Sequence, residues 1–155
     1  MALMFDGLAE KAFCRSHIAL NQPIRVSGDP AINVNAGLCS TLAGPISDGS
    51  LPGDVVKTGG GVLVLDAVNT YTGATTISGG TLALSGAGSI AASSGVTDNS
   101  IFGISAATAD VPIKSHAGSG AVTLGARSHE ILSGTSTYTG ATTIAGGELP
   151  DSARS

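Results

Sequence analysis

The chain has very few aromatic and charged residues. Aromatic residues make up 3% of its 155 residues, tryptophan is absent, and charged residues make up 12%. Soluble domains average about 25% charged residues, so this surface must be solvated largely by hydroxyl groups and backbone. The 42% of hydrophobic residues still suffice for one buried core, and they exclude disorder driven by high charge.

Positive charge is also scarce. The formal net charge is −4, and the lysines and arginines are dispersed singly over Lys11, Arg15, Arg25, Lys57, Lys114, Arg127 and Arg154. Binding to a nucleic-acid backbone requires clustered cations that displace counterions. Nucleic acid is therefore not expected as a partner.

Neither a disulfide framework nor a membrane segment is indicated. Two cysteines, Cys14 and Cys39, are too few for a framework, and whether they pair is left open. No run of 18 apolar residues occurs, so we expect no transmembrane helix. Asp6, Glu10 and Lys11 interrupt the N-terminal apolar stretch, so we expect no signal peptide there.

One short amphipathic helix is predicted near the N-terminus. Apolar residues recur at the three- and four-residue spacing of a helix, at Phe5, Leu8, Ala9, Ala12 and Phe13. We assign residues 1–22 to an N-terminal segment that covers an open end of the structure that follows.

From residue 23 to 155 the pattern is that of many short β-strands. Apolar residues alternate with small or polar ones, and glycine, serine, asparagine, aspartate or proline bounds each run at intervals of about 8 to 12 residues. The inward-facing pairs are expected at Ile24 and Val26, Ile32 and Val34, Leu63 and Leu65, Leu82 and Leu84, Val111 and Ile113, and Val122 and Leu124.

Eight consecutive residues, TYTGATTI, occur at 70–77 and again at 137–144. Strands of sandwiches and barrels occupy different environments, whereas a solenoid reuses one environment in every coil. A coil of three short strands needs roughly 22 residues, so the offset between the copies is close to three coils. The repeat therefore predicts a β-helix in which Ile77 and Ile144 face the core on the same side of the stack.

The stretch VKTGGGVLVLDAVNTYTGATTISGGTLALSGAGSI, residues 56–90, resembles the passenger-associated repeat of bacterial autotransporters, which are type V secreted proteins. The resemblance is clear again over 137–149 and weaker over 102–126, with repeat copies placed near 56–90 and 130–149. It implies a right-handed, single-stranded parallel β-helix, exposed at the cell surface or released. It also implies a full-length form with a C-terminal outer-membrane β-barrel. The sequence departs from that pattern in its missing signal peptide and barrel and in its abrupt end, ELPDSARS, for which a truncated reading frame is the simplest explanation.

Aligning the two copies places Glu130 where the first copy has Leu63, an inward position. Burying an unpaired carboxylate costs several kcal/mol. We therefore expect a register shift or bulge near 127–130 rather than a buried charge.

No catalytic, cofactor or metal residue is predicted. GAGSIA, residues 86–91, approximates a dinucleotide-binding motif, but no helix is indicated after it, so its glycines are expected in turns. Cys14 and His17 have a C-x-x-H spacing, while His116 and His129 lie far along the chain. A metal site needs three or four converging ligands, and the spacing indicates no such set.

The leading function is a non-enzymatic passenger segment, a surface-exposed stalk or adhesin whose ligand is an unknown surface or glycan. The alternative is a glycan-binding or polysaccharide-active β-helix. A glycan-binding surface made of threonine hydroxyl groups would need threonines on one face of every coil. Here the threonines cluster in only one coil of three, which does not favour such a surface. An enzyme would have to draw on Asp98, Asp110, Lys114 and Glu130, and convergence of Asp98, Asp110 and Lys114 on one face would favour the alternative.

Overall fold

The computed structural model describes residues 16–107, 111–125 and 130–145. Within these ranges the chain forms β-strands joined by turns, without a helix. The strands are β1 (Ser16–Leu20), β2 (Ile24–Gly28), β3 (Ala31–Asn33), β4 (Leu38–Leu42), β5 (Ile46–Gly53), β6 (Val55–Thr58), β7 (Val62–Leu65), β8 (Thr75–Ile77), β9 (Thr81–Gly86), β10 (Val96–Asp98), β11 (Ile101–Ala107), β12 (Val111–Ile113), β13 (His116–Ala117), β14 (Ala121–Leu124), β15 (Glu130–Leu132) and β16 (Thr142–Ile144).

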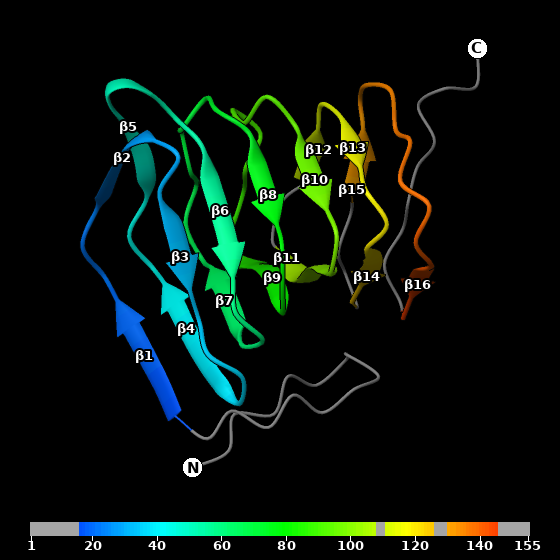
Figure 1. Ribbon diagram of the computed structural model, residues 1–155, viewed down its shortest axis with the longest axis horizontal. Helices are drawn as coiled ribbons and strands as arrows, with labels where there is room; N and C mark the ends of the chain where they lie inside the picture. Colours follow the sequence, from blue (N-terminus) through cyan, green and yellow to red (C-terminus); the bar gives the residue numbers. More distant parts are fainter. Residues whose placement is uncertain (1–15, 108–110, 126–129, 146–155) are drawn as a thin grey trace.

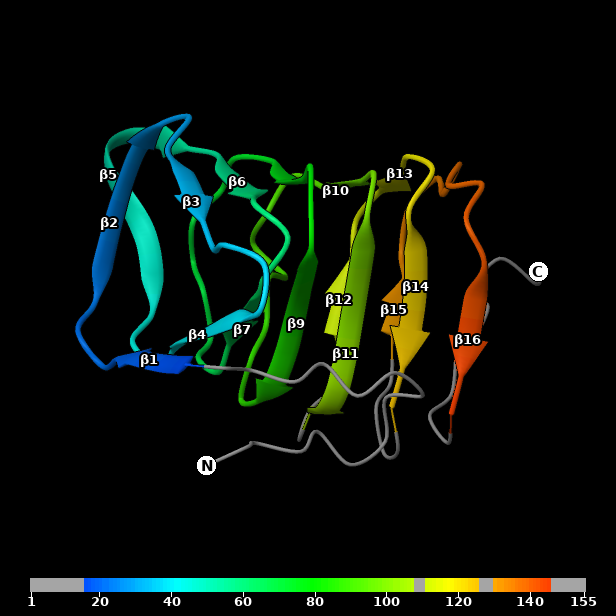
Figure 2. The ribbon, with the colours of Figure 1, turned by 60° about the horizontal axis from the view of Figure 1, so that its bottom comes forward.

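The strands wind into a parallel β-solenoid of about six turns. A seven-stranded sheet in the order β1-β4-β7-β9-β11-β14-β16 forms one face, and a five-stranded sheet in the order β13-β10-β8-β6-β3 forms another. The pairs β2-β5 and β12-β15 complete the turns (Figures 1 and 2). The predicted all-β parallel β-helix is confirmed. The predicted helix at residues 5–13 lies outside the described residues, and β1 of the 1–22 segment already belongs to the stack.

The length of a turn follows from the strand register. Thr81 pairs with Ile101, and Ile101 pairs with Ala121, so each of these turns takes about 20 residues, at the short end of the range for repeat proteins. Nearer the N-terminus the turns are longer, since Cys39 of β4 pairs with Val62 of β7.

Buried aliphatic residues form a continuous ladder through the seven-stranded sheet. Parallel pairing places residues of the same register on one another in successive turns, and the members are Leu42, Leu65, Leu84, Ile104 and Leu124. All are at most 3% exposed, and Leu82 and Leu84 point inward as predicted. Each fully buried leucine or isoleucine contributes about 1.5–3 kcal/mol relative to an exposed one, so this ladder is a main source of stability.

The two copies of TYTGATTI occupy different sheets, which corrects the prediction for Ile77 and Ile144. Ile77 lies in β8 of the five-stranded sheet and is 0% exposed, whereas Ile144 lies in β16 of the seven-stranded sheet and is 49% exposed. The turns between the copies are shorter than the sequence predicted, which explains the difference. Following the pairs from Thr75 through the next turns leads to Ser136, which precedes the repeated Thr142. The second copy therefore reaches the next face of the solenoid.

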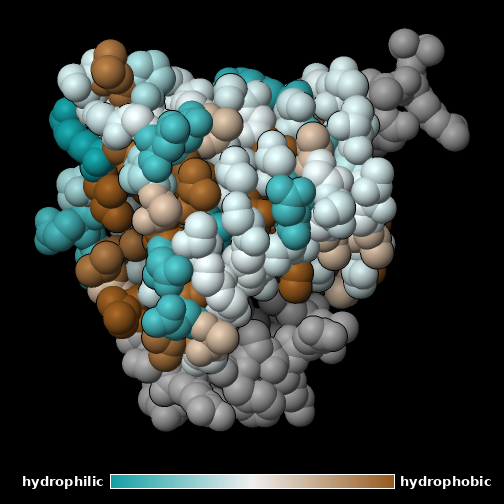
Figure 3. Space-filling model, in the orientation of Figure 1, coloured by the Kyte–Doolittle hydropathy of each residue, from teal (hydrophilic) through white to brown (hydrophobic). Residues whose placement is uncertain are grey.

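The surface is mostly neutral, with an apolar area at the N-terminal end. Figure 3 shows hydrophobic side chains gathered over the first strands. The exposed large hydrophobic residues of β1 and β5 are Ile18, Leu20 and Leu51. Pale residues of intermediate hydropathy dominate the remainder of that face. No helix long and apolar enough to cross a membrane occurs in the described part of the chain.

Candidate functional site

The first repeat copy builds a buried network of hydroxyl groups. The Tyr71 hydroxyl lies 2.7 Å from Thr75 Oγ1, which in turn lies 3.0 Å from Ser93 Oγ in the next turn. Ser93 Oγ donates to the carbonyl oxygen of Gly73 at 2.8 Å. Burial raises the pKa of Tyr71 to about 12, against the opposing effect of the Thr75 bond. The network links adjacent turns through side chains that would be costly to bury without partners.

Asn69 connects three successive turns. Its Oδ1 accepts a hydrogen bond from the Ile46 amide at 2.9 Å, and its Nδ2 donates to the carbonyl oxygens of Ala67 and Ser89 at 2.9 and 3.0 Å. At 2% exposure the amide is satisfied entirely by backbone. It acts as a clip between neighbouring coils.

The two residues after Tyr71 contact the preceding turn. Asp48 accepts hydrogen bonds from the Thr72 hydroxyl at 2.7 Å and from the Thr72 and Gly53 amides, and the Thr72 hydroxyl bond is the main reason that the pKa of Asp48 is lowered. A Cβ on Gly73 would collide with the Gly53 carbonyl oxygen and with the Asp54 carboxylate. The residues of the Asn-Thr-Tyr-Thr-Gly segment, 69–73, therefore make structural contacts within the solenoid.

The second copy keeps the local bond in a more exposed position. Tyr138 and Thr142 are joined at 2.8 Å, as in the first copy, but Thr142 is exposed and Ser136 stands where the first copy has Asn69. A Cβ on Gly140 would collide with the Gly120 carbonyl oxygen, as at Gly73. The motif thus retains its own geometry on a different face.

Lys57 is a fully buried cation that the sequence analysis did not single out. Its Nζ donates to the carbonyl oxygens of Thr58, Gly59 and Gly79 at 2.8, 2.9 and 3.0 Å. Burial lowers the pKa of Lys57 to about 8. Period-2 alternation with Val55 already places Lys57 on the inward side of β6.

Three ionisable side chains are buried inside the C-terminal turns, and two of them are in contact. His116 Nδ1 lies 3.4 Å from Glu130 Oε1, and the two side chains are 0% and 1% exposed. Asp98, also 0% exposed, interacts electrostatically with His116. The His116 ring stacks on Tyr138 with centroids 4.5 Å apart and meets Phe102 edge-on at 5.7 Å. This buried cluster, Asp98, His116 and Glu130, is closed to a polymeric substrate in this conformation.

The structure corrects the prediction for Glu130. Residues 126–129 lie outside the described part of the chain, but Glu130 itself is buried and paired with Val111 of β12. Val122, not Glu130, stacks in the ladder of Leu63. His116 lies beside the buried carboxylate, a contact between turns that aligning the two copies could not reveal.

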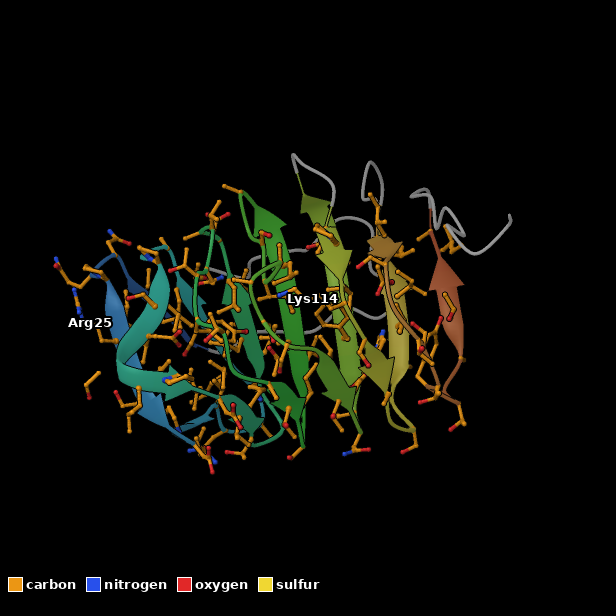
Figure 4. The ribbon with its side chains drawn as sticks, turned by 90° about the horizontal axis from the view of Figure 1, so that it is seen from above. Arg25 and Lys114 are labelled. Carbon is orange, nitrogen blue, oxygen red and sulfur yellow. The ribbon has the colours of Figure 1, made fainter. Side chains whose placement is uncertain are left out.

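The other predicted positions are dispersed. Gly86 ends β9 with a positive φ of 55°, and a turn rather than a helix follows it, in agreement with the expected turn glycines. Lys114 is exposed and donates to the Ala92 carbonyl oxygen at 2.9 Å, so it does not converge with the buried Asp98. Asp110 lies outside the described residues. Figure 4 shows Arg25 at the N-terminal end and Lys114 over the middle of the stack.

The candidate cysteines and histidines do not form a metal site within the described residues. Cys39 is buried and takes part in a disulfide bond, while Cys14 and His129 lie outside the described residues. His17 lies in β1 of the seven-stranded sheet, whereas His116 lies in β13 of the five-stranded sheet. Within the described ranges, no three histidine, cysteine, aspartate or glutamate side chains are grouped to hold a metal ion.

Comparison with known proteins agrees with this geometry. The model of the passenger-associated-transport-repeat matches residues 55–84, which span β6 to β9, and residues 117–149, which include the second copy of TYTGATTI. No curated protein and no solved structure matches the chain. The predicted resemblance to autotransporter passengers is confirmed, and the chain carries two copies of the passenger-associated transport repeat.

Proposed function

We propose that this chain is a non-enzymatic segment of an autotransporter passenger, exposed at the cell surface as a β-helical stalk or adhesive face. The observation that carries the proposal is the unbroken ladder of buried aliphatic residues from Leu42 to Leu124, shared by successive strands of one sheet. Such a stack resists bending because each turn is bonded to the next along its length.

The two matches to the passenger-associated-transport-repeat support the surface location. The surface chemistry supports presentation rather than electrostatic steering. In the described ranges the exposed cations are Arg25 and Lys114, which are far apart. A partner would meet hydroxyls, backbone and small side chains, which suits a neutral glycan or a protein surface.

The contacts of the repeat also support a structural role. The polar groups of Tyr71, Asn69 and Lys57 are hydrogen-bonded within the solenoid, and all three side chains are buried. Asp98, His116 and Glu130 are also buried, so their side chains do not line an accessible face. The alternative, a polysaccharide-active β-helix, would need carboxylates arranged along an accessible face.

Location is tested by labelling intact cells that express the natural gene with antibodies raised against the purified chain. We expect labelling before permeabilisation, and removal of the signal by protease added outside the cell. A periplasmic protein labelled in parallel shows whether the envelope stayed intact. Labelling that requires permeabilisation would contradict the surface location.

Enzymatic activity is tested by incubating the purified chain with acidic and neutral polysaccharides and measuring new reducing ends. We expect none above a heat-denatured control. Adhesion is measured with the same chain coupled to beads and presented with host matrix proteins and glycans. Release of reducing ends that Asp98→Asn abolishes would replace the proposal with the alternative.

A further inference from the structure

The N-terminal and central turns differ from the C-terminal turns in whether their buried polar side chains have hydrogen-bond partners. In the N-terminal and central turns, the buried side chains of Lys57, Asn69 and Thr75 all have hydrogen-bond partners. In the C-terminal turns the opposite holds. Buried side-chain atoms without a hydrogen-bond partner occur, among the described residues, in Asp98, Ser105, His116, Glu130 and Ser136.

The backbone closes tightly over this region. Asp98 Oδ1 accepts a hydrogen bond from the Ser100 amide at 2.9 Å, but Oδ2 has no partner. A Cβ on Gly120 in the next turn would collide with the Asp98 carboxylate. The carboxylate is therefore held under the following coil, away from water that could solvate a charge.

His116 is the one described group that can balance the two carboxylates. It stacks in register on Val96 of β10, while Glu130 comes from β15 and Asp98 from the end of β10. The remaining described neighbours are the Phe102 ring of β11, Ser136, which bridges to His116, and Tyr138. No described lysine or arginine contacts the cluster, and the ammonium of Lys114, two residues from His116, is bonded to Ala92.

We propose that protonation of His116 controls whether the last turns, β15 and the segment through Tyr138, remain attached to the body of the solenoid. With a neutral imidazole, the two buried carboxylates have no counterion among the described residues, and like charges in a buried site repel. With an imidazolium, His116 forms a charged pair with Glu130 and attracts Asp98. The turns close in mildly acidic surroundings and open as the pH rises.

The ionisation of Asp98 acts in the same direction. Burial raises the pKa of Asp98, against the opposing effects of the Ser100 amide, the His116 charge and the Phe102 amide. A carboxyl group with a raised pKa binds its proton more tightly in the folded state, so its contribution is complete below its unfolded pKa and is lost as the pH rises through the folded value.

Amide hydrogen exchange on the full chain tests the proposal at pH 5.5 and 7.5, after correction for intrinsic exchange rates. The reporting amides are Ser133 and Thr137, bonded to Ile113 and His116 across turns, with Ser78 and Thr81 as references in the body. We expect protection of the first pair to fall about tenfold or more on raising the pH, which corresponds to about 1.4 kcal/mol of opening free energy. The reference pair should change little.

His116→Gln and Glu130→Gln should lose this pH dependence, whereas Lys114→Gln should retain it. If either cluster variant fails to fold, the titration of the His116 ring resonance in the unaltered chain decides. Equal protection at both pH values, an equal loss in the body, or a His116 ring whose charge stays constant from pH 5 to 8 would each overturn the proposal.

Discussion

Tyr71 and Thr75, four residues apart in sequence, join their hydroxyl groups at 2.7 Å inside the core. Tyr138 and Thr142 repeat this bond at 2.8 Å near the surface of another sheet. Tyr71 is 0% exposed, whereas Tyr138 is only partly buried and Thr142 is exposed. The same local bond thus stands in two environments, and its value for stability should differ between them.

Tyr71→Phe should lower the free energy of unfolding by about 1–2 kcal/mol, because it removes a buried hydrogen bond without changing the ring. Tyr138→Phe makes the same change where water can replace the bond, and should cost less than about 0.5 kcal/mol. Urea unfolding followed by circular dichroism measures both. Equal losses in the two variants would contradict the difference in burial.

Gly73→Ala should lower the free energy of unfolding by about 2 kcal/mol or more, because its Cβ would strike the Gly53 carbonyl and the Asp54 carboxylate. Gly103→Ala is the matched control, since the nearest atom to its Cβ would be 3.9 Å away. It should change stability by no more than about 0.5 kcal/mol. Thermal unfolding of the two variants checks the contrast, and similar midpoints would show that the turn at Gly73 has room to relax.

Lys57→Met should destabilise the fold by roughly 3 kcal/mol, because three partly buried carbonyl oxygens lose their donor. Lys114→Met removes the same ammonium group from an exposed position with one carbonyl partner and should cost less than about 0.5 kcal/mol. Denaturant titration separates the two. A Lys57→Met variant as stable as the original would show that the carbonyl groups find other donors.

The free energy of unfolding should rise between pH 8 and 9.5. Burial lowers the pKa of Lys57 from 10.5 to about 8, so in this range the unfolded chain binds more protons than the folded one. Stability then increases with pH. Above pH 10 the raised pKa of Tyr71 acts in the opposite direction, which sets the upper limit of the window. Unfolding curves at several pH values should show the rise, and Lys57→Met should abolish it.

The inward ladder was predictable because it depends on alternation within single strands. Leu63, Leu65, Leu82 and Leu84 are all 0% exposed, as their period-2 spacing indicated. Turns were equally local, and Gly80 has the positive φ, 67°, expected where the chain reverses. Features set within a single strand and its flanking turns therefore followed from the sequence.

Features that depend on summed turn lengths did not follow. A small error in the length of each coil, added over successive coils, shifted the second copy onto another face, so Ile144 lies in a different sheet from Ile77. The pairing of His116 with Glu130 depends on the same cumulative register, and neither residue alone marks the contact. Lys57 could have been recognised from its alternation with Val55, but its three acceptors come from two different turns.

The placement of the second copy bears on how such rods can change in length. The offset between the copies, from Thr70 to Thr137, is not a whole number of turns, yet the duplicated tyrosine and threonine re-form their bond on the face they reach. The stabilising tyrosine–threonine bond lies within the repeated segment itself. Such a segment can therefore be inserted into a solenoid by recombination without matching the register of the neighbouring turns. Sequences of this type are therefore free to evolve new lengths by imprecise copying.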